Sequence, residues 1–132
     1  MLGSANFGDA IVIADLEAGI GTLTRLDPRT VDAVVIVVEP TPRSIDVAKR
    51  AYELAVEREQ GRIVIVANRM VDADDDTLIC EAFPGHDVVR VPFDSAIGDA
   101  DRAGLSPLDS APTSPAVVAL LGVVERIRFS TA

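Results

Sequence analysis

Four short apolar segments constrain the fold of this chain more than any other feature. Residues 10–14, 33–38 and 62–67 are rich in β-branched side chains without polar alternation, and residues 87–91 form a weaker fourth segment. Strands that are apolar on both sides are buried on both faces, which is typical of a parallel sheet covered by helices. Because helix-like stretches separate the segments, we expect an α/β fold with a mostly parallel sheet of about four strands, flanked by helices.

The stretch after the second segment carries the signals of an amphipathic helix. Thr41 is suited to cap a helix with Pro42 in its first turn, where the missing N–H of proline would be unpaired in any case. Gly61 is expected to end this helix. Its apolar face follows the i, i+3, i+4 spacing and comprises Ile45, Ala48, Tyr52 and Ala55.

Two further helices are expected nearer the C-terminus. One spans about residues 74–82, with acidic residues in the first turn, where the helix dipole favours negative charge. Residues 104–113 are rich in Pro, Ser and Gly and are expected to form a loop. The last helix begins at Ser114 and Pro115 and runs to about Phe129. Its buried stripe is expected to consist of Val117, Leu120, Leu121, Val124 and Ile127.

Composition narrows the classes of function. The 132 residues predict one domain, and the net charge of −9 argues against nucleic acid or an anionic membrane as a general partner. The longest apolar stretch, residues 116–124, is too short to cross a bilayer, and no secretory signal is visible, so a cytoplasmic location is expected. The single Cys80 fits a reducing compartment. The single Lys49 has no glycine before it, so a mechanism that needs a phosphate-binding Gly-Lys pair is not expected of this chain alone.

Polar residues follow the ends of the predicted strands, where ligands bind in open α/β sheets. Asp15 comes directly after the first segment, and Gly19 follows at the fourth position, a pattern suited to a magnesium–nucleotide site. A carboxylate there can hold a metal-bound water, and a glycine lets its N–H approach a phosphate. Asn68 follows the third segment and can both donate to and accept from a purine edge. The fourth segment is followed by residues that could wall a base: Pro92, Phe93 and Asp94.

Each of these residues also has a structural interpretation. An aspartate at a strand end often begins a turn, and an asparagine there often adopts an unusual backbone conformation. Taken by itself, Phe93 is better explained as a core residue beside a strand-ending turn than as the wall of a base site. His86 and the acidic run at residues 72–76 lack the spacing of a metal site, so a turn and a solvated helix start are the favoured interpretations.

The order of these motifs resembles the deviant-Walker P-loop ATPases, the group that includes MinD, ParA and the nitrogenase iron protein. Residues 13–20 are similar to their Walker B and switch II segment, and the resemblance continues through residues 31–44 and 65–69 to residues 91–104. The similarity is strongest to the CooC-type accessory ATPases of carbon monoxide dehydrogenase. It covers roughly residues 10–125, and the order and spacing of the motifs carry it more than any one motif.

The resemblance implies a role for each matching residue. Asp15 would act on Mg²⁺ through water, and Gly19 would sense the γ-phosphate of ATP. Asn68 would contact adenine, and the loop closing over the base would consist of Pro92, Phe93 and Asp94. The role of Glu17 stays open. By the same resemblance, the cofactors would be ATP or ADP with Mg²⁺, and the family would act in metallocentre assembly.

Three parts of the family pattern have no match. Only residues 1–9 precede the Walker B segment, so the glycine-rich Walker A loop and the switch I aspartate have no match, and the Cys-x-Cys metal site has none because Cys80 is alone and lies elsewhere. The chain is thus similar to the C-terminal half of such an ATPase, a single truncated domain over residues 1–132. Because the phosphate contacts are lost together, we expect weak or absent nucleotide binding and no meaningful ATPase activity in isolation. Without the P-loop strand, the first two strands lose their shared neighbour, so we expect either direct pairing between them or an oligomer.

Two functions from different classes remain. The first is an ATP-binding, ATPase-like domain that is not catalytic by itself. The second is a non-catalytic interaction module, or pseudo-ATPase subunit, that pairs with a partner chain bearing a P-loop. A phosphoacceptor receiver domain ranks below both, because such domains need a lysine at a strand end and Lys49 lies within a predicted helix.

Overall fold

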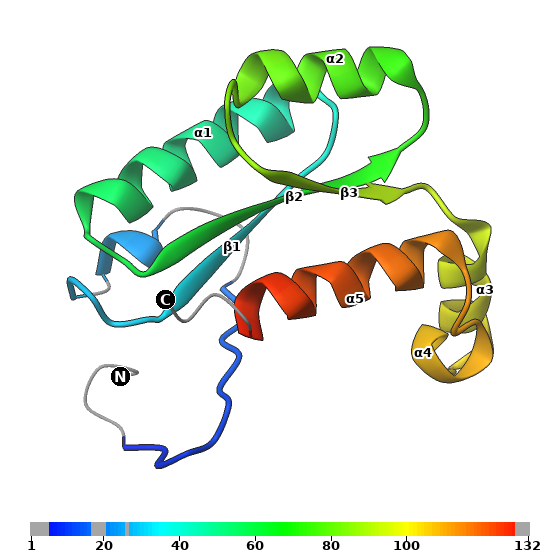
Figure 1. Ribbon diagram of the computed structural model, residues 1–132, viewed down its shortest axis with the longest axis horizontal. Helices are drawn as coiled ribbons and strands as arrows, with labels where there is room; N and C mark the ends of the chain where they lie inside the picture. The colour runs from blue at the N-terminus through cyan, green and yellow to red at the C-terminus, as the bar shows by residue number, and fades with distance from the viewer. Residues whose placement is uncertain (1–5, 17–20, 26, 129–132) are drawn as a thin grey trace.

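The computed structural model describes residues 6–16, 21–25 and 27–128 (Figure 1). Its strands are β1 (Ala33–Val38), β2 (Arg62–Met70) and β3 (Val88–Pro92). Its helices are α1 (Pro42–Glu57), α2 (Ala73–Ala82), α3 (Ser95–Ala103), α4 (Pro107–Ser110) and α5 (Pro115–Arg128), and a 3-10 turn, η2 (Leu23–Arg25), precedes β1. None of the described helices is long and apolar enough to cross a membrane.

The described strands form one parallel sheet in the order β1–β2–β3. β1 pairs with β2 along its whole length, and β2 pairs with β3 through a bulge between Ala67 and Met70. The predicted α/β class and the parallel sheet flanked by helices are confirmed. The described sheet has three strands rather than about four.

The predicted first strand does not form. Residues 10–14 have no regular secondary structure, and the side chains of Ile11 and Ile13 are 82% and 90% exposed. The expectation that this segment pairs directly with β1 is therefore wrong for the single chain. The physical reason is a missing neighbour, because an apolar segment forms a stable strand only where another strand takes up its backbone hydrogen bonds.

Helices cover the two faces of the sheet unequally (Figure 1). α1 and α2 pack on one face, whose buried core is Ile36, Val38, Ala48, Ile65, Ala67, Ile79, Phe83 and Val88. α5 packs on the other face, over β3 and β2, and the buried core there is Val64, Val66, Val89, Val91, Ala116 and Val123. The α5 face of β1 stays uncovered within the described chain, since Val35 and Val37 are 40% and 58% exposed.

α5 confirms the predicted last helix but not its predicted buried stripe. Val117 is buried as expected. The other four predicted members are 39–46% exposed: Leu120, Leu121, Val124 and Ile127. The prediction assumed a covering layer along the whole apolar face, whereas α5 rests on β3 and part of β2 only.

α1 follows the sequence signals at its start and departs from them at its end. Thr41 caps the helix by accepting a hydrogen bond from the Ser44 N–H at 3.3 Å. α1 stops well before Gly61, so the predicted role of Gly61 as the helix end is wrong. The Gly61 N–H donates to the Val31 carbonyl at 3.0 Å, and a Cβ on Gly61 would lie 1.9 Å from the Asp32 carbonyl oxygen. Glycine is required there by the close approach of two backbone segments.

The remaining helices begin at aspartate or serine caps. Asp72 caps α2, which confirms the helix predicted near residues 74–82. Asp94 caps α3, a helix that the sequence patterns did not single out. Ser106 caps the short α4, which lies within the predicted loop at residues 104–113.

Candidate functional site at the carboxyl edge of the sheet

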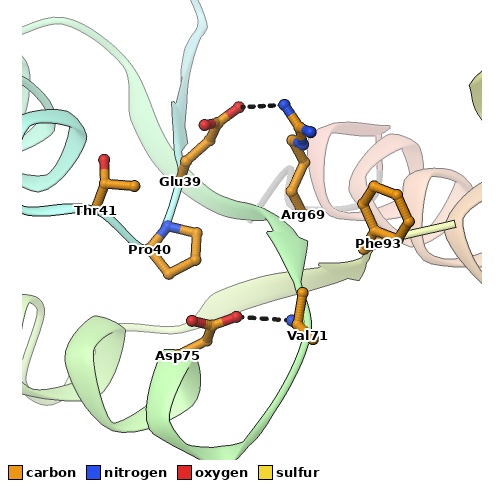
Figure 2. A pocket seen from close by; sticks show the side chains of 7 residues that line it. All are labelled: Glu39, Pro40, Thr41, Arg69, Val71, Asp75 and Phe93. Carbon is orange, nitrogen blue, oxygen red and sulfur yellow. Dashed lines mark hydrogen bonds and ion pairs between the residues drawn. The ribbon is translucent and has the colours of Figure 1, made fainter.

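An open hollow of about 540 Å³ lies where the three strands end (Figure 2). The strand ends and the starts of α1 and α2 contribute its lining residues: Glu39, Pro40, Thr41, Arg69, Val71, Asp75 and Phe93. The carboxyl edge of a parallel sheet is where open α/β folds bind their ligands. The hollow is therefore the candidate site.

Arg69 connects the ends of all three strands. Its Nη1 lies 3.8 Å from Glu39 Oε1, and its guanidinium carbon lies 5.9 Å from the centre of the Phe93 ring. Figure 2 shows the Arg69 side chain between Glu39 and Phe93. Arg69 has a φ of 58° within the bulge of β2. A bulge re-aims the side chain that it carries, and this one directs Arg69 toward its two partners.

Apolar surface lines one part of the hollow. Phe93 is 57% exposed, which excludes the alternative that it belongs to the core. Its N–H donates to the Met70 carbonyl at 2.8 Å, so β2 holds the backbone that carries the ring. Pro40 and Val71 also contribute to the lining. A fixed, exposed aromatic face of this kind offers a planar ligand a surface for stacking.

Acidic groups line another part. The Asp75 carboxylate accepts a hydrogen bond from the Val71 N–H at 2.8 Å, and the Glu39 carboxylate forms the ion pair with Arg69. Among the lining residues, Arg69 is the only cation, and Glu39 already pairs with it. Two carboxylates beside a neutralised arginine favour a neutral or weakly cationic ring over a polyanion. The charges of the lining therefore suit a neutral planar group better than a polyanion.

Asp94 is committed to structure. One carboxylate oxygen accepts from the Ala96 N–H at 3.0 Å, and the other accepts from the Ala116 N–H at 3.1 Å. The Ala116 bond, then the Ala96 bond and a weaker one from Ser114 lower the pKa of Asp94 below the ordinary carboxyl value. Asp94 thus joins the starts of α3 and α5 next to the loop that carries Phe93.

Asn68 and Pro92 both lie on strands beside the hollow. Asn68 lies within β2 rather than after it and is half-buried. It directly precedes Arg69 but is not among the lining residues. Pro92 ends β3 opposite Met70. The predicted base-side residues are therefore grouped on the ends of β2 and β3, with Phe93 alone contributing directly to the lining.

Of the predicted metal and phosphate residues, the described one does not line the hollow. Asp15 is exposed, lies in a segment without regular secondary structure, and is not among the residues that line the hollow. Gly19 and Glu17 lie outside the described residues. No group of three or more His, Cys, Asp or Glu side chains in the described ranges is arranged to hold a metal ion.

Sequence reasoning missed two of the lining residues that matter most. Glu39 directly follows β1, and Arg69 is the last residue but one of the neighbouring parallel strand β2. The two side chains carry opposite charges. The opposite charges at the carboxyl ends of two adjacent strands could have predicted this ion pair from the sequence.

Comparison with known proteins shows which sequences this chain is related to. No protein-family model matches the chain. Over 102 residues it is 38% identical to the carbon monoxide dehydrogenase accessory protein CooC of Rhodospirillum rubrum, a match that covers 76% of this chain and 39% of CooC. The chain is thus a relative of CooC over most of its own length.

A second relative is by its name an ATP-binding protein. Over 92 residues the chain is 35% identical to the uncharacterized ATP-binding protein MJ0823 of Methanocaldococcus jannaschii, which covers 67% of this chain and 36% of that protein. The resemblance predicted from the motifs is thereby confirmed. The chain spans less than half the length of the relatives that it matches.

Proposed function

We propose that the chain provides the base-binding part of an ATP-binding, ATPase-like domain of the CooC type. The observation that carries the proposal is the hollow at the carboxyl edge, where the exposed ring of Phe93 lies beside Arg69. The relatives support the ligand class, because the name of MJ0823 describes ATP binding. The other relative is by name an accessory protein of carbon monoxide dehydrogenase, and we propose metallocentre assembly as the corresponding role of the whole protein.

The adenine ring would stack on Phe93, with the Asn68 amide at its polar edge and Pro92 holding the loop in place. Asp94 would act through structure, because both of its oxygens already accept backbone hydrogen bonds. Arg69 would lie against the base as a planar cation whose charge is balanced by Glu39. Stacking on an aromatic ring tolerates any purine, so the amide edge would supply the preference for adenine.

The chain would bind the phosphate groups of a nucleotide only weakly. Glu39 and Asp75 repel phosphate groups, and the net charge of −9 opposes polyanion binding. We therefore propose that adenosine, ADP and ATP bind with similar, low affinity, that Mg²⁺ adds little, and that the isolated chain hydrolyses no ATP. The proposed role of Asp15 with Mg²⁺ requires residues 10–16 to leave the exposed, irregular conformation described above, and Gly19, proposed to sense the γ-phosphate, lies outside the described residues.

Calorimetric titration with adenosine, ADP and ATP, with and without Mg²⁺, tests this function. Phe93→Ala is expected to weaken binding by roughly tenfold or more, because stacking on an aromatic ring contributes about 1–3 kcal/mol per base. Asn68→Ala should weaken adenosine binding as well. The matched control is Phe7→Ala, which removes another exposed phenylalanine, 48% against 57% for Phe93, that does not line the hollow.

Two results would separately contradict the two parts of the proposal, base binding at the hollow and weak phosphate binding. Equal affinity of Phe93→Ala and wild type for adenosine would contradict a base site at the hollow. ATP binding far tighter than adenosine binding, or ATP turnover that Asp15→Ala abolishes, would show that the chain has its own phosphate grip.

A second candidate is a non-catalytic interaction module, or pseudo-ATPase subunit, that pairs with a P-loop-bearing partner. The exposed apolar residues of α5 favour it, because an apolar helix face of this size is normally covered. Mixing the purified chain with purified Rhodospirillum rubrum CooC should give a joint size-exclusion peak that Leu121→Glu abolishes. Separate elution of the two proteins at all ratios would remove this candidate.

A further inference from the structure

β1 is an open edge of the described sheet. One side pairs with β2, and no described strand lies on the other side. The sequence of β1, AVVIVV, contains neither a charge nor a proline, the devices that normally protect an edge strand. Val35 and Val37 pair with Val64 and Val66 in the parallel register, so they point to the α5 face of the sheet, where they are exposed. β1 thus offers both unpaired backbone groups and apolar surface.

Residues 10–14 of the same chain are equally uncovered. The segment is Ala-Ile-Val-Ile-Ala, a composition with high strand propensity. Ile11 is 82% exposed, Val12 45% and Ile13 90%. The backbone groups of residues 11–16 make no hydrogen bond to another described residue. A strand-forming segment without a sheet and a sheet edge without a strand therefore coexist in one chain.

We propose that two copies of this chain associate by strand exchange, with residues 10–14 of each copy adding to the free edge of β1 of the other. A second copy is the favoured occupant because each copy carries both complementary parts. A two-fold arrangement then satisfies both edges and both segments at once. The segment of five residues is one residue shorter than β1, so it can pair along nearly the whole strand.

The side chains of the two parts are compatible. Successive side chains of a strand point to opposite faces, so Ile11 and Ile13 share one face of the added strand. Placed on the α5 face, they lie beside Val35 and Val37 and extend the apolar surface across the sheet. Each copy carries a net charge of −9, so the copies repel at low ionic strength. Apolar association against this repulsion should strengthen as salt screens the charge.

Light scattering and sedimentation of the purified full chain test the association. Wild type should have twice the monomer mass of 13.9 kDa at high concentration, with a dissociation constant that falls as salt is added. The Ile11→Asp/Ile13→Asp variant should raise that constant by roughly tenfold or more, because two large apolar contacts are lost. The matched control is Leu105→Asp, at a 56% exposed site between α3 and α4, and it should leave the constant unchanged.

Mixed cross-linking tests the strand exchange itself. In a Cys80→Ser background, a chain with Ile13→Cys is mixed with a chain with Val37→Cys and oxidised. A disulfide between the two different chains is expected, and replacing Val37→Cys by Leu105→Cys should abolish it. A monomer at all concentrations, a dimer that Ile11→Asp/Ile13→Asp leaves intact, or the absence of the mixed disulfide would each overturn the proposal.

Discussion

The two faces of the sheet are covered to different extents. Two adjacent valines of β1 show this difference. Val38 faces α1 and is fully buried, whereas Val37 faces the α5 side and is 58% exposed. Both residues have the same side chain and lie on the same strand. The difference teaches that burial is set by the layer opposite a residue, and that the second layer over β1 is missing from the described chain.

The largest expected effect comes from Gly61. Gly61→Ala would push a Cβ into the Asp32 backbone and should cost about 4 kcal/mol or more in the free energy of unfolding. Gly122 in α5 has open space around it, so Gly122→Ala should raise that free energy by about 0.5–1 kcal/mol through helix propensity. Urea unfolding of both variants measures the contrast. Effects of the same sign would contradict it.

A smaller effect is expected from the valine pair on β1. Val38→Ala should cost about 1–3 kcal/mol, because it removes buried methyl groups from the α1 face. Val37→Ala should change the free energy of unfolding by less than about 0.5 kcal/mol in dilute protein, where association is absent. Equal costs, measured by urea unfolding, would mean that the α5 face of β1 is covered in the monomer.

The smallest effect is a pH dependence at the junction of α3 and α5. The pKa of Asp94 is lowered in the folded chain, so its stabilising contribution is present above the unfolded carboxyl pKa. That contribution is lost as the pH falls through the folded pKa, below about pH 4. Asp94→Asn should therefore melt below wild type at neutral pH and converge with it in acid. The control is Asp109→Asn in the exposed α4, and a constant gap between Asp94→Asn and wild type across this range would contradict the assignment.

The fold was predictable wherever an apolar segment has at least one other strand beside it and a helix over it within the described chain. β1, β2 and β3 follow the apolar segments closely, and Thr41 caps α1 as its sequence position indicates. The segment at residues 10–14 has the same composition and still forms no strand, because a strand also needs a partner that composition does not reveal. The predicted buried stripe of α5 was wrong for a related reason, because burial needs a covering layer that the sequence of the helix does not reveal.

The candidate site was predictable in place but only partly in content. The strand-end pattern located Phe93 at the edge where the hollow lies. It did not reveal that β2 continues through Asn68, nor that a bulge turns Arg69 toward Glu39, since bulges depend on the register between strands. The capping role of Asp94 depends on how α5 packs against the start of α3, a contact between residues distant in sequence.

Adenosine titration followed by amide chemical shifts of the labelled chain would locate the base site. The shifts should concentrate at Arg69, Val71 and Phe93 and should saturate at a similar concentration for adenosine and ATP. Shifts that are absent at saturating adenosine, or that gather on α5 and residues 10–14 instead, would contradict a base-binding hollow at the carboxyl edge.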